Sequence, residues 1–313
     1  MANTINYASK YERELIQTFV DNSYIAPFVA DNVQWLDAKN FHFTALALGG
    51  YKNHVLTGGW NRQNVTSTDK TYTVSQDRDV EFFLDRREVD EGNQTATIEN
   101  VSNQFERTQA TPEKDAYFFS KVATEATNAS LKTSTAITTY TADTIYTKVV
   151  QFIGNVRRYR NKGLIVYLAP VLMDLLALSK ELTHSMDVMT ISANDGKAIQ
   201  TRITQIDGVP IVEVIDEDRF YSKFDFSDGY KPAVGSYKIN MLAATPLTTK
   251  MVPKISSIYF FAPGEHTEGD GYLYQNRAHY DTFVFPNGKD TKIDSIYVDL
   301  DTTAVTDDSD DEG

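Results

Sequence analysis

Alternating apolar and polar residues dominate the chain between residues 41 and 84. The runs FHFTALAL, GGYKNHVLTGGW and TDKTYTVSQDRDVEFFL follow one another, and Gly-Gly pairs between them mark turns. Tyr72 and Val74 alternate with threonine and serine, as in a strand with one face in water. We therefore expect a long hairpin over 41–84. Because a two-stranded ribbon buries little surface by itself, this hairpin needs another surface to lie on.

Helical spacing of apolar residues follows over 93–128. Pro112 interrupts this stretch, and Thr111 stands before it as a suitable N-cap. The pattern predicts two helices separated by a break at 110–112. A third helix is expected over 143–159, where an apolar stripe ends in three arginines that suit the negative end of the helix dipole.

A strand, a helix and two more strands are predicted next. LIVYLA has the continuous apolar character of a buried strand, Pro170 opens the helix VLMDLLALSK, and ITQIDGVPIVEVI gives two strands around a turn at Asp207–Gly208. This order predicts an α/β module over about 135–250. The later runs SSIYFFA, YLYQNRAHYDTFVF and KIDSIYVDL are rich in β-branched and aromatic residues, and they predict strands that return to an earlier sheet. The predicted fold class is α+β.

The two ends of the chain have little apolar content. Residues 1–40 contain one helical-looking segment at 11–20 and are otherwise polar, so we expect an arm with little core of its own. The C-terminal TDDSDDEG has too few apolar residues to fold and is expected to be a solvated tail or a contact tail.

Composition narrows the class of protein. The chain has 313 residues, 41% of them hydrophobic, which suffices for two domains or one elaborate one. It has no cysteine, so disulfides, thiolate nucleophiles and cysteine-bound metals are excluded, as suits a reducing cytoplasm. The N-terminus does not resemble a signal peptide, and no apolar run is long enough for a membrane span. A net charge of −13 would repel a phosphate backbone, so DNA is expected as a neighbour and not as a ligand.

Residue patterns typical of catalysis are few. The five histidines have no metal-binding spacing, and the sequence lacks nucleophile-elbow, P-loop and dinucleotide signatures. Carboxylates over 85–91 could act in glycoside hydrolysis, but interleaved arginines favour a solvated turn. Arg277, Tyr280 and Asp281 could bind an anion or a sugar, although pairing of Arg277 with a carboxylate on a neighbouring strand is the preferred interpretation. We expect no catalytic residue, cofactor or metal.

Four segments, in this order and spacing, resemble a known family. They are SQDRDVEFFLDRREVDE at 75–91, FERTQATPEKDAYFFSKVA at 105–123, DGVPIVEV at 207–214 and YLYQNRAHYDTFVF at 272–285 leading into IYV. The chain resembles the major capsid proteins of tailed bacteriophages with the HK97-like fold, particularly those of phages that infect Gram-positive bacteria. The likeness covers nearly the whole chain.

The resemblance implies a domain plan. Residues 1–40 would be the N-terminal arm, 41–84 the E-loop hairpin, 85–134 with 251–300 the P-domain, 135–250 the A-domain and 301–313 an acidic tail. The P-domain would combine a spine helix with a long antiparallel sheet, so YLYQNRAHYDTFVF would be a packed strand and not a cleft. Two sets of residues are implied at contacts: Trp60, Arg62, Lys70, Asp77 and Arg78 on the E-loop, and Arg86, Glu106, Arg107, Arg277, Tyr280 and Asp281 in the P-domain.

The function implied by the resemblance is that of a shell subunit. The chain would form hexamers and pentamers that close an icosahedral head around double-stranded DNA, without sequence-specific binding. Its expected partners are a separate scaffolding protein, a portal and, as an open alternative, a decoration protein. Assembly would occur in the cytoplasm of the host bacterium, the product would belong to the virion, and no membrane would be involved.

Two further expectations concern chemistry and alternatives. Lys70 lies near the position of a cross-linking lysine in one branch of the family, but no matching asparagine or glutamate is found, so assembly is expected to be noncovalent. An encapsulin-like nanocompartment shell is the first alternative function. A carbohydrate-active enzyme or binding module is the second.

Overall fold

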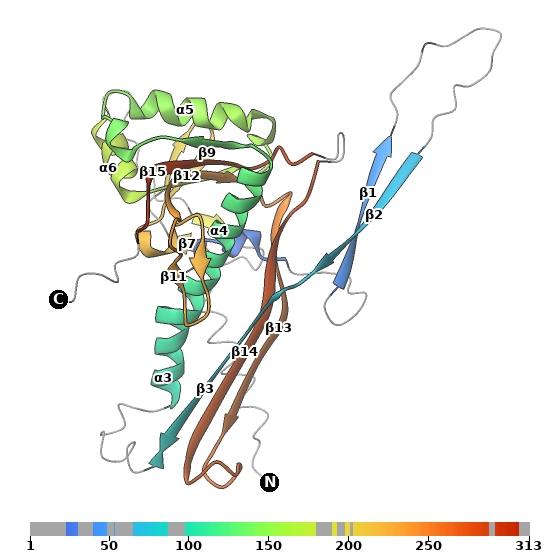
Figure 1. Ribbon diagram of the computed structural model, residues 1–313, viewed down its shortest axis with the longest axis vertical. Helices are drawn as coiled ribbons and strands as arrows, with labels where there is room; N and C mark the ends of the chain where they lie inside the picture. Colours follow the sequence, from blue (N-terminus) through green and yellow to red (C-terminus); the bar gives the residue numbers. More distant parts are fainter. Residues whose placement is uncertain are drawn as a thin grey trace.

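The computed structural model describes residues 23–30, 40–48, 53, 65–86, 98–179, 190–192, 198–200, 203–287 and 292–306. Two sheets organise these residues (Figure 1). One is a six-stranded sheet with helices against it, and the other is a long, narrow sheet of three strands that extends away from it. The predicted mixture of helices and sheets is confirmed.

The six-stranded sheet is the centre of the compact lobe. Its strand order is β4 (Lys132–Ser134), β15 (Tyr297–Ala304), β12 (Tyr237–Ala244), β5 (Ile165–Leu168), β9 (Val209–Glu213) and β8 (Ile203–Ile206). All four residues of β5 are buried, and they alternate between two hydrophobic clusters. Val166 and Leu168 face α5 (Ile145–Asn155) and α6 (Pro170–Leu178), whereas Ile165 and Tyr167 face α4 (Thr111–Asn128). Helices therefore cover both faces of this sheet.

The local predictions for this lobe are confirmed. The run LIVYLA contains β5, and Pro170 occupies the first position of α6. The turn between β8 and β9 has both central residues at positive φ, 56° for Asp207 and 73° for Gly208. Aspartate tolerates this conformation and glycine adopts it readily, and such turns match the twist of a two-residue hairpin. Shorter elements complete the lobe: η3 (Ile137–Thr139), η4 (Arg157–Tyr159), η5 (Glu217–Arg219), β10 (Phe224–Asp225) paired with β11 (Lys231–Pro232), and β6 (Thr190–Ser192) paired with β7 (Ala198–Gln200).

One helical rod replaces the two separate helices predicted over 93–128. It consists of α3 (Ile98–Phe105), a π-helical turn η2 (Glu106–Ala110) and α4. Thr111 keeps helical dihedrals and does not cap, so the predicted break at 110–112 is wrong. The Thr111 N–H donates to the Glu106 carbonyl, five residues back. We attribute the continuity to this wide turn, because it accommodates a proline, whose ring clashes with a regular helix and whose nitrogen donates no hydrogen bond.

The long sheet has the order β13 (Thr249–Phe261), β14 (Gly271–Val284), β3 (Gln76–Asp85), all antiparallel. YLYQNRAHYDTFVF is thus the central strand of a sheet, as expected. Tyr274 and Phe82 share one face, where their rings stack 6.0 Å apart and Phe82 meets Phe105 of the helical rod. This contact places the rod alongside the sheet (Figure 1).

A separate hairpin projects away from both sheets (Figure 1). It pairs β1 (Asn40–Leu48) with β2 (Val65–Thr73) in unbroken register. The predicted hairpin over 41–84 is therefore too long, because residues 76–84 pair with β14 and not with β1. The alternating pattern runs through both strands, so it marks no change of sheet between them. Only long-range pairing with β14 separates the two.

Two other boundaries differ from the prediction. The strand predicted at the end of 251–300 is β15, which pairs with β12 and β4 in the six-stranded sheet and does not join β13 and β14. β15 also continues to Ala304, so the first residues of the predicted tail belong to a strand. Residues 307–313, most of the acidic tail, lie outside the described residues.

Residues 23–30, predicted to be part of an arm with little core, are instead built into the core. Ile25 and Phe28, the latter in η1 (Ala26–Phe28), are completely buried. Phe28 packs 4.8 Å from the ring of Phe118 on α4 and 6.3 Å from that of Tyr167 on β5. The prediction was wrong here because the short apolar run YIAPF has no periodicity, and its burial depends entirely on distant partners.

Candidate functional site

A metal site requires several ligating side chains close together. No cluster of three or more His, Asp and Glu that could hold a metal occurs among the described residues. In the acidic run 85–91, only Asp85 and Arg86 are described, and the remaining carboxylates lie outside the described residues. No helix in the described part of the chain is long and apolar enough to cross a membrane.

Arg277 pairs with a carboxylate on the neighbouring strand, as the preferred interpretation held. Its Nε and Nη2 atoms donate to the two oxygens of Asp77 on β3, at 3.0 and 2.7 Å. Both side chains lie on the outer face of the long sheet and are exposed to solvent. Because the fork of the guanidinium is already matched to a carboxylate, Arg277 does not present a ready anion site.

Arg78, expected as a contact residue of the E-loop hairpin, joins three parts of the same chain. From β3 it donates to Glu113 of α4 at 2.7 and 3.3 Å. It also donates to the backbone carbonyls of Phe226 and Gly229, in the segment around β10 and β11. Tyr280 of β14 adds a hydroxyl 3.4 Å from Glu113. Arg78 is therefore an internal tie between the long sheet, the rod and the compact lobe.

Asp281 forms a second internal tie and is buried. One carboxylate oxygen accepts from the Ser75 N–H at 3.0 Å and its hydroxyl at 2.7 Å, while the other accepts from the Tyr117 hydroxyl at 2.8 Å. Burial raises the pKa of Tyr117 well above its ordinary value, and the Asp281 carboxylate raises it further. Tyr117 therefore keeps its hydroxyl proton and remains a hydrogen-bond donor. The bond fixes α4 to the long sheet beside the junction between β2 and β3.

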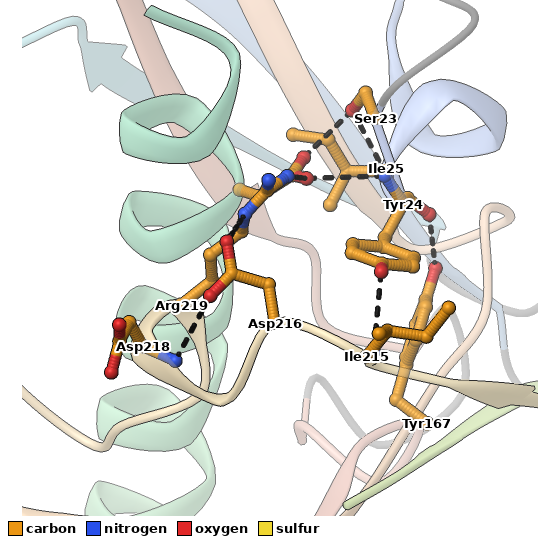
Figure 2. Close-up of polar contacts among 9 residues, drawn as sticks. Ser23, Tyr24, Ile25, Tyr167, Ile215, Asp216, Asp218 and Arg219 are labelled. Atoms are coloured by element: carbon orange, nitrogen blue, oxygen red, sulfur yellow. Dashed lines mark hydrogen bonds and ion pairs between the residues drawn. The ribbon is translucent and has the colours of Figure 1, made fainter. Parts of the chain in front are cut away.

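The third tie was missed by the sequence reasoning. Asp115 of α4 is completely buried and accepts from the Ser23 hydroxyl at 2.7 Å and the Tyr24 N–H at 3.2 Å. Arg219 of η5 approaches it at 3.2 Å, and Asp216 holds the same guanidinium at 2.7 Å. Figure 2 shows these groups converging on the N-terminal segment. The only sequence signal was an aspartate on the apolar side of a predicted helix, which identifies neither partner.

The backbone around Tyr24 is bound from two further sides. The Tyr167 hydroxyl of β5 donates to the Tyr24 carbonyl at 2.8 Å, and the Tyr24 hydroxyl accepts from the Ile215 N–H at 3.2 Å (Figure 2). Arg219 also lies over the Tyr24 ring, 5.7 Å from its centroid. We call Ser23, Tyr24, Asp115, Tyr167 and Arg219 the arm anchor. It connects the N-terminal segment to a helix, a strand and a loop of the compact lobe.

A groove of about 730 Å³ lies between the helical rod and the long sheet. Its floor includes Val80, Ile258 and Ala278 of the sheet, and its rim includes the π-helical turn. The charged side chains on the rod-facing side of the groove are Arg78, Lys114, Glu106, Glu113 and Asp228, whereas Asp77 and Asp79 alternate with Arg78 along β3 and lie on the outer face. Both cations contact carboxylates of the groove itself, Glu113 and Glu106 respectively. The groove therefore has a small excess of negative charge beside an apolar floor.

The remaining predicted contact residues fall into three groups. Trp60 and Arg62 lie outside the described residues, and Lys70 is placed only by its backbone, opposite Phe43. Glu106 is buried and paired with Lys114 at 3.1 Å, so it is part of the rod's own structure. Arg86 and Arg107 are exposed.

Exposed aromatic residues mark the far end of the long sheet. Phe83 on β3 is 42% exposed and Tyr259 on β13 is 54% exposed, both on the outer face. Phe260 is 38% exposed on the opposite face, where its ring stacks on that of Tyr272. We call Phe83 and Tyr259 the sheet-end patch. Single exposed aromatics are common, but two on the same face at the end of one narrow sheet are typical of a contact surface.

The sequence matches no known protein family and no curated protein. The fold, in contrast, matches solved structures over nearly its whole length. The capsid of cyanophage P-SCSP1u aligns with a TM-score of 0.61 at 11% identity, covering 89% of this chain and 87% of that one. The mature capsid of bacteriophage PhiM1 aligns with a TM-score of 0.58 at 13% identity, covering 91% and 87%.

A virus-like particle from Pyrococcus furiosus has the same fold more distantly. It gives a TM-score of 0.50 at 11% identity, covering 93% of this chain and 98% of that one. The class of fold follows from these likenesses: the chain has the HK97-like fold of capsid subunits, as the sequence resemblance implied. At these low identities the comparison defines the fold, and the function has to be argued from the surfaces of the molecule.

Proposed function

We propose that this chain is the major capsid protein of a tailed bacteriophage, which assembles into hexamers and pentamers and forms an icosahedral shell around double-stranded DNA. The observation that carries the proposal is the agreement of about nine-tenths of the chain with phage capsid subunits of similar length. A match that spans both chains leaves no large part of this protein to serve another purpose. The product would be a component of the virion, assembled in the host cytoplasm.

The hairpin supports assembly because it lacks a core of its own. β1 and β2 form a sheet of two strands, and such a ribbon is marginal in water unless another surface covers it. In a ring of identical subunits, that surface is supplied by a neighbour through a heterologous contact. The role of Lys70 and of Trp60 and Arg62 in this contact stays a proposal.

Charge complementarity supports a location for the contact. Residues 49–64, which connect β1 to β2, include Lys52 and Arg62 and no acidic residue. The groove between rod and sheet has an apolar floor and carries three carboxylates against two cations. We propose that the loop of one subunit binds in or beside the groove of the next. Arg86 and Arg107, both exposed, are the P-domain side chains proposed for further contacts, because the other predicted residues there have internal partners.

The net charge of −13 supports a container for DNA. A wall that repels phosphate allows the genome to be packed without adhering to it. Separate scaffolding and portal proteins are further proposed partners, as the sequence resemblance implies.

The alternative shell function is a nanocompartment that holds host protein. The likeness to the virus-like particle favours it to a lesser extent, at a TM-score of 0.50 against 0.61 for the cyanophage capsid. The enzyme alternative loses support because Arg277, Tyr280 and Asp281 each have protein partners.

Electron microscopy with light scattering tests the proposal. We expect the purified chain to form closed shells or flat hexagonal sheets, either alone or with the scaffolding protein encoded beside it. Particles recovered from the source phage should contain DNA. Shells filled with host protein would favour the nanocompartment, and a monomer under both conditions would contradict the shell function.

Charge reversal tests the proposed contact. Arg62→Glu and Lys70→Glu should lower the yield of particles while the purified subunits keep their far-ultraviolet circular dichroism. Lys148→Glu, on the exposed side of α5, changes the net charge equally and is the matched control. Equal yields for all three variants would remove the hairpin from the mechanism. Sodium dodecyl sulfate gels of mature particles should show only single subunits, since assembly is expected to be noncovalent.

A further inference from the structure

The arm anchor places an ionisable group where water does not reach. Asp115 has no exposed surface, and the Ser23 side chain and Ile25 above it are also buried. Its charge is balanced by one guanidinium at 3.2 Å, but Arg219 lies closer to Asp216, at 2.7 Å. Asp115 therefore shares its guanidinium with a second carboxylate. A shared cation offsets less of the free-energy cost of burying a charged carboxylate than an unshared one does.

The other groups facing Asp115 do not compensate its charge. Three tyrosines from separate elements interact with it electrostatically: Tyr24 of the N-terminal segment, Tyr167 of β5 and Tyr230 between β10 and β11. Burial raises the pKa of each, so all three are neutral near pH 7. The Arg219 pKa is raised as well, and this side chain stays charged. Asp216 faces Arg219 from the other side.

The direction of the effect follows from burial. Desolvation raises the pKa of Asp115 to about 6, against the opposing influence of Arg219, Ser23 and the Tyr24 N–H. When residues 23–25 leave, water reaches the carboxyl and its pKa falls back toward the ordinary value of about 3.9. A group with the higher pKa in the docked state takes up a proton on docking. Docking is therefore strongest at low pH and weakens as pH rises through about 6.

We propose that Asp115 is a protonation-dependent anchor, which holds residues 23–25 against α4 and β5 more tightly when its carboxyl is neutral than when it is charged. In the neutral state, the Asp115 carboxyl still accepts hydrogen bonds from the Ser23 hydroxyl and the Tyr24 N–H. Arg219 then remains paired with Asp216. The inference concerns a single subunit and holds whether or not the chain assembles.

Hydrogen exchange on the full-length subunit measures the anchor directly. The Tyr24 amide donates to Asp115 of α4 and is hydrogen-bonded only while the segment is docked, whereas the Ile25 and Phe28 amides donate to Ser23 and Ile25 within the segment. After correction for the intrinsic pH dependence of exchange, we expect the opening equilibrium of peptide 23–28 to be about tenfold larger at about pH 7.5 than at about pH 5. Amides of β12 in the same molecules report any change in global stability. Equal opening at both values, or tighter docking at the higher one, would overturn the proposal.

Two variants separate the buried carboxyl from its neighbour. Asp115→Asn keeps the shape of the side chain without a titrating proton, so its opening equilibrium should not depend on pH and should resemble that of the wild type at about pH 5. Asp216→Asn keeps the buried carboxyl but leaves Arg219 to it alone, so the pH dependence should remain and be smaller than in the wild type. If Asp115→Asn retains the wild-type dependence, the proposal fails. If that variant does not fold, the wild-type measurement decides the question by itself.

Discussion

The six-stranded sheet and the three-stranded sheet bury their surfaces in different ways. Two separate hydrophobic clusters cover the two faces of the six-stranded sheet, one beneath α5 and α6 and the other beneath α4 and the N-terminal segment. The long sheet is covered by the helical rod on one face, and its outer face carries an exposed ion pair and the sheet-end patch. The compact lobe therefore buries both faces of its sheet, whereas the long sheet leaves one face exposed.

The largest expected effect of a single change lies in the compact lobe. Phe118 is completely buried and contacts Phe28 and Phe119. Phe118→Ala leaves a cavity between α4 and the N-terminal segment and should lower the free energy of unfolding by about 3–5 kcal/mol. Urea denaturation of the unassembled subunit measures this loss. A loss below about 1 kcal/mol would mean that the lobe does not depend on this contact. It would contradict the contrast between the buried six-stranded sheet and the partly exposed long sheet.

An intermediate effect is expected where the two regions meet. Arg78→Met removes the cation beside Glu113, which is only 14% exposed, and should lower the free energy of unfolding by about 1–3 kcal/mol. Combining Arg78→Met with Glu113→Gln in a double-mutant cycle should recover part of this loss, because the charge left unpaired is then absent. An unchanged urea midpoint for Arg78→Met would show that the tie contributes nothing to the isolated subunit. The outer pair of Arg277 and Asp77 is the solvent-exposed reference, for which little change is expected.

The smallest expected change in the stability of the subunit should come with the clearest expected change in the yield of particles. Phe83→Ser removes one aromatic ring from the sheet-end patch and should lower the free energy of unfolding by only about 1 kcal/mol, because the ring is 42% exposed and the rest of it packs against His266 and Gly271. Particle yield should nevertheless fall, as judged by sedimentation. Leu178→Ser, at a 71% exposed position on α6, is the matched change in the compact lobe. A similar loss of particles from both variants would remove the distinction between the two regions.

Local elements were the most predictable part of this protein. The run LIVYLA, Pro170 and the Asp207–Gly208 turn gave a strand, a helix start and a hairpin, because each depends on the conformational preferences of a few adjacent residues. Pro112 misled the prediction, since its effect on a helix depends on whether the preceding turn widens. The Arg277 pair was also predictable, because its partner lies on the adjacent strand.

Long-range ties were not predictable in the same way. Ser23 meets Asp115 across 92 positions of the chain, and Ser75 meets Asp281 across 206. The residues next to each aspartate in the sequence do not show whether its side chain is buried and accepts hydrogen bonds from the backbone or is exposed to solvent. The assignment of 76–84 to the long sheet had the same cause, because alternation predicts a strand without naming its partner.

The sequence by itself determined many of the local elements, the acidic charge, the absence of thiol chemistry and the resemblance to capsid proteins, since these depend on composition and on patterns along the chain. Tertiary structure decided which strands share a sheet, which carboxylates are buried and where the N-terminal segment is held. Those features depend on distant residues that meet only when the chain folds. The free energy that stabilises them comes from the burial of apolar surface, from packing and from hydrogen bonds between distant residues, which no short stretch of sequence contains.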